Sequence, residues 1–316
     1  MMTDCTGRIV TKTPRTEAAY QTRAHNLLMM AKREDAAVED LADLIDWFGA
    51  RHSRWAPSTV RQYRAALAHA LETATFDAID KARLNEQLHA GPAPKTKGPK
   101  RTSARKRKSL KRDEFVRLGE FLRRSARPDD LLVHSFIALG AALFLRPVEY
   151  LNARVEGTML IVANAKATNG RGNGAQRERD LSEMEPKAIA ALKTFLVRLR
   201  TALRDTGNWT RLRDRLAARL ARICKRLKIA RVSFYTLRHT GMATAKTWMS
   251  PVEVAAAAGH AAVRTATSHY AKRRTGWLGL KLAGKPSAAS IARVRGQPKL
   301  FQPRPSIIGP SYVSKL

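Results

Sequence analysis

A basic, proline-containing segment in the first third of the chain limits how this sequence can fold. Residues 91–112, GPAPKTKGPKRTSARKRKSLKR, contain three prolines, ten lysines or arginines and no acidic residue. A dense run of one charge repels itself and offers few apolar side chains to bury, so it cannot form a core. We therefore expect a linker between two separately folded domains, at residues 16–90 and 113–280, with a flexible start at 1–15 and a basic tail at 281–316.

The charge balance narrows the class of partner. The 316 residues include 59 Lys and Arg against 26 Asp and Glu, which gives a formal net charge of +33. This excess points to a polyanion. Nucleic acid fits better than a membrane surface, because no basic amphipathic helix with aromatic anchors stands out. The longest apolar run, Leu131 to Leu145, is shorter than the about 20 residues that a membrane span needs, so we expect a buried helix there.

Cysteine usage and the N-terminus bear on the compartment. Cys5 and Cys224 show neither a metal-ligand spacing nor a disulfide framework, and the first ten residues lack a signal-peptide pattern. A reducing cytoplasm fits both observations. No cluster of acidic residues suggests a magnesium site, so we expect no cofactor and no metal.

The N-terminal domain is predicted to be entirely helical. Apolar residues recur at helical spacing from Thr16 onward and again from Val38 to Phe48. Pro57 opens a third helix, and a fourth follows at about Phe76 to His89. The third helix has an inner apolar stripe, and Arg61 and Arg64 fall outside it. The stripe consists of Val60, Tyr63, Leu67 and Leu71.

The second domain combines helices with a short β-hairpin. After the buried apolar helix, Arg146 stands just before Pro147, with Glu149 close behind. Thr158 to Val162 and Gln176 to Leu181 are β-prone and flank a glycine-rich loop. Two long helices, at about 186–204 and 209–227, bury leucine stripes, and arginines crowd their outer faces.

The stretch 233–273, SFYTLRHTGMATAKTWMSPVEVAAAAGHAAVRTATSHYAKRR, reads as three short helices, each with one polar group that the apolar pattern does not require. The first begins near Thr236, a suitable N-cap, and carries Arg238. The second starts at Pro251 and stops at Gly259, leaving His260 just beyond its end. The third runs from about Val263 to Lys272 and carries Tyr270.

The polar side chains of these helices suit phosphate chemistry. Arginine can bind two phosphate oxygens at once, and histidine donates a hydrogen bond or moves a proton. Tyrosine serves as a nucleophile where cations favour its anion. Each residue taken alone has an ordinary structural explanation.

The ordered set L-R-H-T, G-H and Y resembles the C-terminal boxes of the tyrosine recombinases, or phage integrases, with similar intervals between Arg238, His260 and Tyr270. The segment STVRQYRAAL also resembles the family's core-binding domain. The resemblance implies a mainly α fold with a small β-sheet: an all-α core-binding domain that holds one side of the DNA, joined through the linker to an α+β catalytic domain.

The resemblance also implies roles for individual residues. Tyr270 would attack a DNA phosphodiester and form a covalent 3′-phosphotyrosine, while Arg146 and Arg238 neutralise the developing charge. His260 would hydrogen-bond a phosphate oxygen or orient the nucleophile. Lys166 would protonate the leaving oxygen, with Arg171, Arg177 and Arg179 as rival candidates in the same hairpin. Glu149 would support Arg146, and His239 is a supporting residue that is either structural or catalytic.

By the same resemblance, the activity is site-specific recombination or integration of DNA in a bacterial or phage setting, without a cofactor. Double-stranded DNA is the partner, a homotetramer is the active form on DNA, and accessory DNA-bending proteins are a further class of partner. Some basic side chains are candidates for DNA contacts: Arg61, Arg64, Arg101, Arg105, Lys106, Arg107 and Lys108.

One departure from the family pattern leaves other functions open. The family usually has His-x-x-Arg in its second box, and here the motif is Tyr235-Thr-Leu-Arg238. Tyrosine does not act as a base near neutral pH without a large pKa shift. This departure motivates one alternative, a DNA-binding protein that has lost catalysis. A second alternative is an enzyme like the type IB topoisomerases, which shares the cleavage chemistry.

Overall fold

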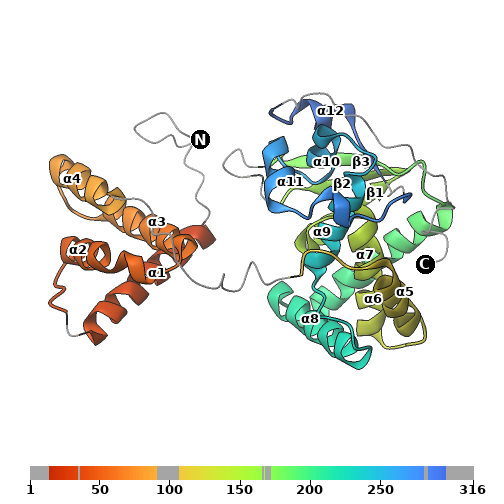
Figure 1. Cartoon of the computed structure of the whole chain (residues 1–316), viewed down its shortest axis with the longest axis horizontal. Coiled ribbons are helices and arrows are strands. Elements are labelled where there is room, and N and C mark those ends of the chain that lie inside the picture. Colours follow the sequence, from red (N-terminus) through yellow and green to blue (C-terminus); the bar gives the residue numbers. More distant parts are fainter. Residues whose placement is uncertain are drawn as a thin grey trace. The chain divides into compact units, whose positions relative to one another are not determined.

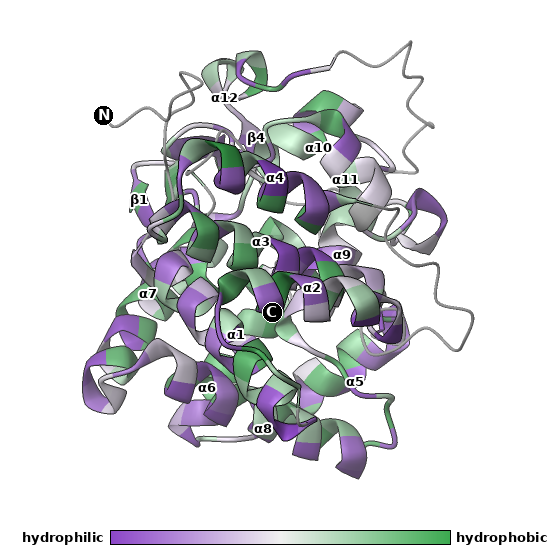
Figure 2. Ribbon diagram, turned by 90° about the vertical axis from the view of Figure 1, so that its left-hand side faces the viewer, coloured by the Kyte–Doolittle hydropathy of each residue, from purple (hydrophilic) through white to green (hydrophobic). Residues whose placement is uncertain are grey.

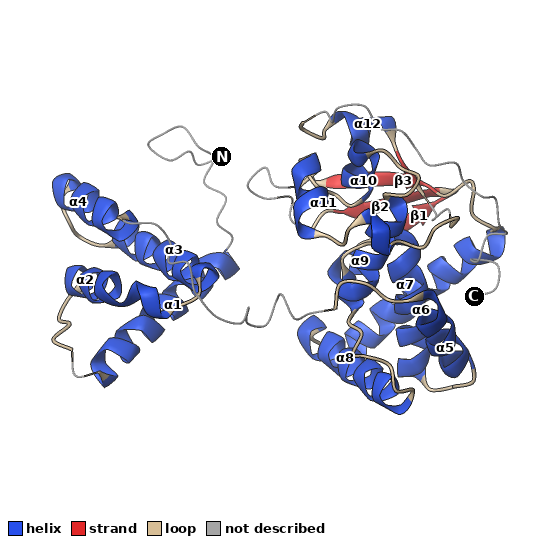
Figure 3. Cartoon of the chain, viewed as in Figure 1, coloured by secondary structure: helices blue, strands red, loops and turns tan. Residues whose placement is uncertain are grey.

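The computed structural model describes residues 14–34, 36–90, 107–165, 167, 172–280 and 284–296. The chain divides into two compact units, Met1–Ala104 and Arg105–Leu316, which we call unit 1 and unit 2. Figure 1 labels their helices and strands, and Figure 3 shows that helices dominate both units. The predicted fold class, mainly α with a small β-sheet, is confirmed.

In its described part, unit 1 contains four α-helices, as the apolar spacing predicted. They are α1 (Pro14–Arg33), α2 (Leu41–Arg51), α3 (Pro57–Thr73) and α4 (Ala78–His89), with a 3₁₀ turn, η1 (His52–Arg54), after α2. The fourth helix begins two residues later than predicted, because the Asp77 side chain accepts a hydrogen bond from the backbone N–H of Asp80 and caps the helix.

The helices of unit 1 bury a common core. Polar and apolar residues alternate along each of them (Figure 2), and the apolar faces meet around Leu27, Phe48 and Leu67. The Phe48 and Trp55 rings stack with centroids 5.6 Å apart, and Tyr63 packs edge-on against Trp55. This core needs no residue from unit 2, so its helical faces alone explain its folding.

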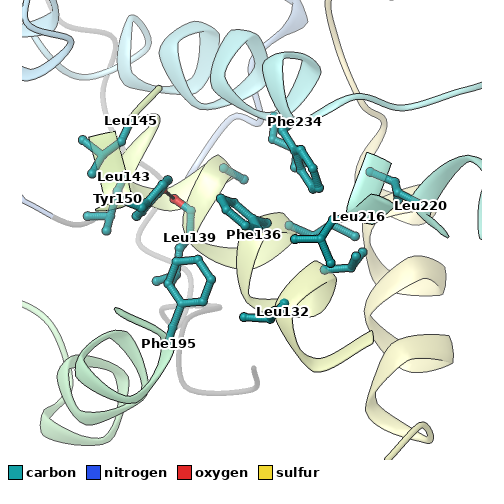
Figure 4. Packing of buried hydrophobic residues seen from close by; sticks show 14 of the residues in the cluster. Leu132, Phe136, Leu139, Leu143, Leu145, Tyr150, Phe195, Leu216, Leu220 and Phe234 are labelled. Carbon is teal, nitrogen blue, oxygen red and sulfur yellow. Dashed lines mark hydrogen bonds between the residues drawn. The ribbon is translucent and has the colours of Figure 1, made fainter. Parts of the chain in front are cut away.

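Unit 2 is built around α6 (Pro128–Leu143), the predicted buried helix. It packs against α5 (Arg112–Arg123), α7 (Pro186–Thr206), α8 (Trp209–Arg226) and α9 (Phe234–Ala245). Figure 4 shows Phe136 of α6 surrounded by Tyr150, Phe195 and Phe234. The Tyr150 hydroxyl donates to the carbonyl of Leu139 at 2.9 Å, which satisfies its polar atom inside the core.

Unit 2 also contains a small antiparallel sheet. Within the described residues its strand order is β1 (Arg154–Glu156), β2 (Met159–Ala163), β3 (Gln176–Asp180) and β4 (Lys285–Pro286). The sequence predicted the β2–β3 hairpin but neither edge strand, since three- and two-residue strands carry no readable alternation. β4 and α12 (Ala288–Ala292) lie within the predicted basic tail at 281–316, so its residues 284–296 belong to the fold of unit 2.

The 233–273 stretch folds as three helices with shifted ends. The first, α9, starts at Phe234, because the side chain of Ser233, not Thr236, provides the N-cap. The second, α10 (Pro251–Ala257), follows the prediction. The third, α11 (Val263–His269), ends before Tyr270, which has an extended backbone with φ −110° and ψ 165°. Tyr270 is therefore beyond the helix end and not on its surface.

The end of the predicted linker is part of unit 2. Leu110 is buried, its N–H donates to the Thr240 hydroxyl, and its carbonyl accepts from the Trp277 indole. Thr236 donates to the carbonyl of Arg107 one helical turn earlier. Residues 107–111 therefore lie along α9. Of the predicted linker, residues 91–106 lie outside the described part of the chain.

The crossing of α6 and α9 gives a first prediction. A Cβ at Gly241 of α9 would overlap the carbonyl oxygen of Ala141 and meet the Cβ of Phe144. We expect Gly241→Ala to destabilise unit 2 by roughly 1–3 kcal/mol through overpacking. Thermal unfolding measures the effect. Gly49→Ala is the control, because a Cβ there has open space. Equal melting temperatures for the two variants would contradict the close helix crossing.

Candidate active site

A buried carboxylate organises the centre of unit 2. Glu149 is 2% exposed and lies in the short 3₁₀ turn η2 (Pro147–Leu151) that follows α6. Its carboxylate accepts from Arg146 Nη1 at 2.6 Å and from Arg177 Nη2 at 2.8 Å, and Arg238 Nη1 lies 3.9 Å away. Burial alone would raise the pKa of Glu149, but Arg177, Arg238 and Arg146 outweigh it and hold the pKa well below its usual range.

The ends of two helices complete this centre. Phe144 ends α6 in the left-handed region with φ 41°, a conformation that is rare for a bulky residue. Its carbonyl accepts from Arg238, and the carbonyl of Leu143 accepts from Arg179. Gly259, with φ +70°, lies just past the end of α10, where the carbonyls of Ala257 and Ala258 accept from Arg177 and Arg238. The arginines thus bond carbonyls that the helices cannot satisfy themselves.

The centre keeps an excess of positive charge. Arg177, Arg179 and Arg238 are fully buried and Arg146 is 6% exposed. Three of these four guanidinium groups lie at the Glu149 carboxylate, and the fourth, Arg179, bonds backbone carbonyls. A helix C-terminus carries roughly half a negative charge, so the ends of α6 and α10 do not balance the remainder. Burial, and then the charge of Arg146, lower the pKa of Arg238. An incoming anion would relieve this repulsion.

Tyr270 and His260 meet at Arg238. Arg238 Nε donates to the Tyr270 hydroxyl at 3.3 Å, and Arg238 Nη2 lies 3.1 Å from His260 Nε2. The Tyr270 ring also packs against the rings of His260 and His239, with centroids 5.0 and 4.9 Å apart. The structure therefore gathers Arg146, Arg238, His260 and Tyr270, with Glu149 and His239, in one place, although they come from segments more than 120 residues apart.

The bonding of His260 settles its tautomer. Arginine only donates, so His260 Nε2 must accept and the ring hydrogen belongs on Nδ1. Burial, Arg238 and Arg146 lower the pKa of His260 to about 2, so the ring is neutral at physiological pH. Its Nδ1 is buried and has no hydrogen-bond partner among the described residues. His260 therefore has one N–H available for an acceptor that enters the site.

His239 is a neutral neighbour of the same tyrosine. Burial, and then the charges of Lys108 and Arg238, lower the pKa of His239 to about 4. The ring is half-buried, and its Nδ1 is buried without a hydrogen-bond partner within the described part of the chain. Its ring packs against the Tyr270 ring and so supports the position of that side chain.

The remaining residues predicted for the site are less closely engaged. Tyr235 is 49% exposed and lies one helical turn before Arg238 on α9. Lys166 and its rival Arg171 lie outside the described residues. The adjoining Ala165 donates its N–H to Glu149 Oε1 at 3.3 Å, and Gly172 forms a β-bridge with His260. The described residues on both sides of this loop therefore reach the cluster.

Arg177 and Arg179 are the residues whose importance the sequence missed. As rivals of Lys166 they were expected to reach out of the hairpin, but both side chains are fully buried. Arg177 bonds Glu149 and Asn164, and Arg179 lies over the Phe144 ring with its guanidinium carbon 4.5 Å from the centroid. The sequence carried one signal for this, the spacing of the two arginines. Residues i and i+2 of a strand point to the same face, so Arg177 and Arg179 share one face of the strand.

The basic residues proposed to contact DNA differ in their surroundings. Arg61 is exposed on α3, and Arg64 donates to the carbonyl of Ala90. Arg107 is less available than expected, because its guanidinium pairs with Glu114 and bonds the carbonyl of Ala230. Lys108 is exposed. The other three, Arg101, Arg105 and Lys106, lie outside the described residues.

Arginines on the outer faces of α7 and α8 are also partly committed within the chain. Arg200 donates to the carbonyls of Leu151 and Ala153. Arg219 pairs with the buried Asp130, and Arg215 with Asp129. In the part of the chain that the structure describes, no group of three or more His, Cys, Asp or Glu could hold a metal ion. No helix there has the length and apolar character to cross a lipid bilayer.

Comparisons with known proteins give a distant structural likeness. No family model matches the chain, and no curated protein does. Among solved structures, the crystal structure of XerA recombinase is similar over 79% of this chain and 91% of that one, with 17% sequence identity and a TM-score of 0.36. Likeness at this level does not establish a shared family, so the function must be argued from the site.

The buried Glu149 gives a prediction on stability. Glu149→Gln removes the negative charge among buried arginines, and we expect it to cost about 3–5 kcal/mol at pH 7. The folded-state pKa lies below the ordinary value of 4.5, so the carboxylate contributes stability that is fully present above pH 4.5 and is lost as the pH falls toward the folded pKa. Denaturant unfolding from pH 7 to pH 3 should therefore show the difference between wild type and variant shrinking.

Glu156→Gln is the matched control for this measurement. Glu156 pairs with Arg154 at 2.6 Å, but both side chains are more than half exposed, so its loss should change stability little. A difference between wild type and Glu149→Gln that stays constant down to pH 3 would contradict the proposed state of Glu149.

Proposed function

We propose that this protein is a site-specific DNA strand transferase, of the recombinase or integrase kind, that cuts and rejoins double-stranded DNA through a covalent bond to Tyr270. The contact between the Tyr270 hydroxyl and Arg238 Nε, at 3.3 Å in a centre with excess positive charge, supports this proposal most. It joins a nucleophile to the cation that would stabilise its anion and the phosphate it attacks.

The reaction conserves phosphodiester bonds. The Tyr270 oxygen loses its proton and bonds to phosphorus, the bond from phosphorus to the 5′ oxygen breaks, and that oxygen leaves as a protonated 5′-hydroxyl. A 5′-hydroxyl of a second strand then reverses the step and frees the tyrosine. The number of phosphoester bonds is unchanged, so the reaction needs no ATP.

The arginines and His260 would act on the phosphate. Arg146 and Arg238 would stabilise the charge on the non-bridging oxygens, which is the largest contribution in many such reactions. Neutral His260 would donate its Nδ1–H to one of them. His260 is not the acid for the leaving oxygen in this scheme. Its lowered pKa keeps the ring neutral, and a neutral imidazole donates its N–H in a hydrogen bond without releasing the proton. Lys166 remains the candidate for that step.

DNA must displace the tyrosine for the reaction to begin. Arg238 has no exposed surface, and the Tyr270 hydroxyl occupies its Nε. A phosphate oxygen that bonds Arg238 would need that place. Tyr270 lies past the end of α11 in extended backbone, so it can withdraw without unwinding the helix. The resting contact thus protects the nucleophile until a phosphate enters.

Trapping of the covalent intermediate tests the proposal directly. A duplex selected from a random library by its affinity for the full-length protein is rebuilt with a nick beside each position in turn, so that the short cleaved piece diffuses away. We expect a protein–DNA adduct with wild type and none with Tyr270→Phe. A Tyr63→Phe variant should form as much adduct as wild type. Absence of any adduct from wild type would reject catalysis by Tyr270 and favour a DNA-binding protein without activity.

Substitution of Arg238 separates catalysis from binding. Removing the whole side chain would orphan the buried carbonyls of Phe144 and Ala258, so Arg238→Lys is the better variant. We expect adduct formation to fall at least about 100-fold, because lysine loses the planar fork. DNA affinity should stay close to wild type, since other basic residues remain. Arg213→Lys, an exposed residue of α8, is the control. Parallel loss of binding and cleavage would contradict the assigned role.

Strand exchange distinguishes the recombinase from a topoisomerase-like enzyme. Recombination of two selected sites supports the recombinase, and relaxation of any supercoiled plasmid supports the alternative. A tetramer on DNA belongs to the recombinase proposal and is tested by the mass of the complex in solution.

A further inference from the structure

Lys246 makes a contact that the proposed chemistry does not use. It is the C-cap residue of α9, and its amine donates to the carbonyl of Ala271 at 2.8 Å. Ala271 is buried and directly follows Tyr270 in the chain. The Lys246 side chain is half-buried, although lysines usually extend into solvent. A lysine on the helix of Arg238 therefore binds the backbone next to the tyrosine.

Other contacts fasten the same segment to α9. Arg273 donates to the carbonyl of Thr247 at 3.2 Å, and the N–H of Trp277 donates to the Thr244 hydroxyl at 3.0 Å. The backbone of Gly276 lies so close to the carbonyl of Ala243 that no Cβ would fit. Residues 271–277 thus follow the C-terminal half of α9, while its N-terminal half carries Arg238. Of these contacts, the Lys246 bond is the one nearest to Tyr270 in sequence.

The surroundings strengthen that bond. Lys246 lines a cavity of about 290 Å³ with the apolar residues Met249, Val254 and Ala266 and with the cationic residues Lys272 and Arg273. Burial lowers the pKa of Lys246 to about 8, and the amine is still mostly protonated at pH 7. A charged donor that is partly withdrawn from water makes a stronger hydrogen bond than a fully solvated one. The Ala271 carbonyl is the acceptor that the structure gives it.

We infer that Lys246 is a positioning residue, which holds the chain at Ala271 so that the Tyr270 hydroxyl, after it gives up the contact with Arg238 Nε, stays within reach of a phosphate bound at Arg238. Tyr270 lies between the end of α11 and this fixed point, without a helix of its own. Without the Lys246 bond, Tyr270 would be held by α11 on its N-terminal side. On its C-terminal side the nearest remaining bonds to the α9 region would be those of Arg273 and Trp277. A displacement of about 1 Å in a reacting group can lower a rate about 100-fold.

The geometric part of the inference is tested without DNA. The six tyrosines are replaced with 3-fluorotyrosine, and the ¹⁹F resonance of Tyr270 is assigned from its loss in Tyr270→Phe. We expect Lys246→Met, which keeps the length of the stem but has no donor, to shift or broaden that resonance. Lys193→Met, at an exposed position of α7, should leave it unchanged. An unshifted Tyr270 resonance in folded Lys246→Met would overturn the inference.

The catalytic part rests on the proposed function and uses the nicked duplex described above. We expect the rate of adduct formation at saturating DNA to fall about 10- to 100-fold in Lys246→Met, with DNA affinity within about twofold of wild type. Lys246→Arg, which restores a charged donor, should recover most of the rate. If Lys246→Met does not fold, Lys246→Leu, which also lacks a donor, replaces it. A full wild-type rate in either variant would overturn the inference.

A sulfur-containing substrate distinguishes positioning from proton donation. In a duplex with sulfur at the 5′ bridging position, the leaving thiolate needs no proton, because a thiol has a pKa of about 8.5. This duplex should not rescue Lys246→Met, whereas it should rescue a variant that lacks the general acid. Rescue of Lys246→Met would mean that Lys246 is the acid and would overturn the positioning role. Absence of an adduct from wild type would instead reject the proposed function, and the ¹⁹F result would still stand.

Discussion

Burying a guanidinium group is unfavourable unless its charge and donors find partners, and the centre of unit 2 buries four of them. Three groups with negative charge or partial charge serve as partners of these arginines: the carboxylate of Glu149, the last carbonyls of α6 and those of α10. Arg238 draws on all three, and its remaining contacts are His260 and Tyr270. The relative positions of η2, α6, α9 and α10 therefore depend on one network, and so does the position of the tyrosine.

The same network explains why the centre suits an anion. The partners of the buried arginines satisfy most of the arginine hydrogen-bond donors but do not balance the arginine charge. A positive excess therefore remains in a buried place. Such a site stabilises negative charge once the Tyr270 hydroxyl has given up its place at Arg238. The two histidines near Tyr270 stay neutral for the same reason, since burial and the arginines lower their pKa values. In this centre the arginines therefore carry the positive charge, and the two histidines are neutral.

The α9 helix links these features mechanically. Arg238 lies in its first half, Gly241 allows it to approach α6, and Lys246 lies at its end beside the segment that follows Tyr270. Residues 107–111 also run along it, with Leu110 bonded to Thr240 and to Trp277. A helix is stiff over this length, so its two halves fix the distance between Arg238 and the segment that follows Tyr270.

Local pattern was enough to place most helices and the β2–β3 hairpin, because apolar spacing, proline and glycine act over a few residues. The set Arg146, Arg238, His260 and Tyr270 was chosen through the resemblance to a family's motifs. Local pattern could not identify Arg177 and Arg179 as buried, since their partners Glu149, Ala257 and Leu143 lie 28 to 80 residues away. Local pattern also placed Tyr270 inside the third helix. In the structure that helix ends at His269, and the segment after Tyr270 contacts the end of α9 instead. Sequence by itself determined which groups are available and in what order. Only the tertiary structure decided which of them meet, because burial and charge pairing depend on segments that are remote in the chain.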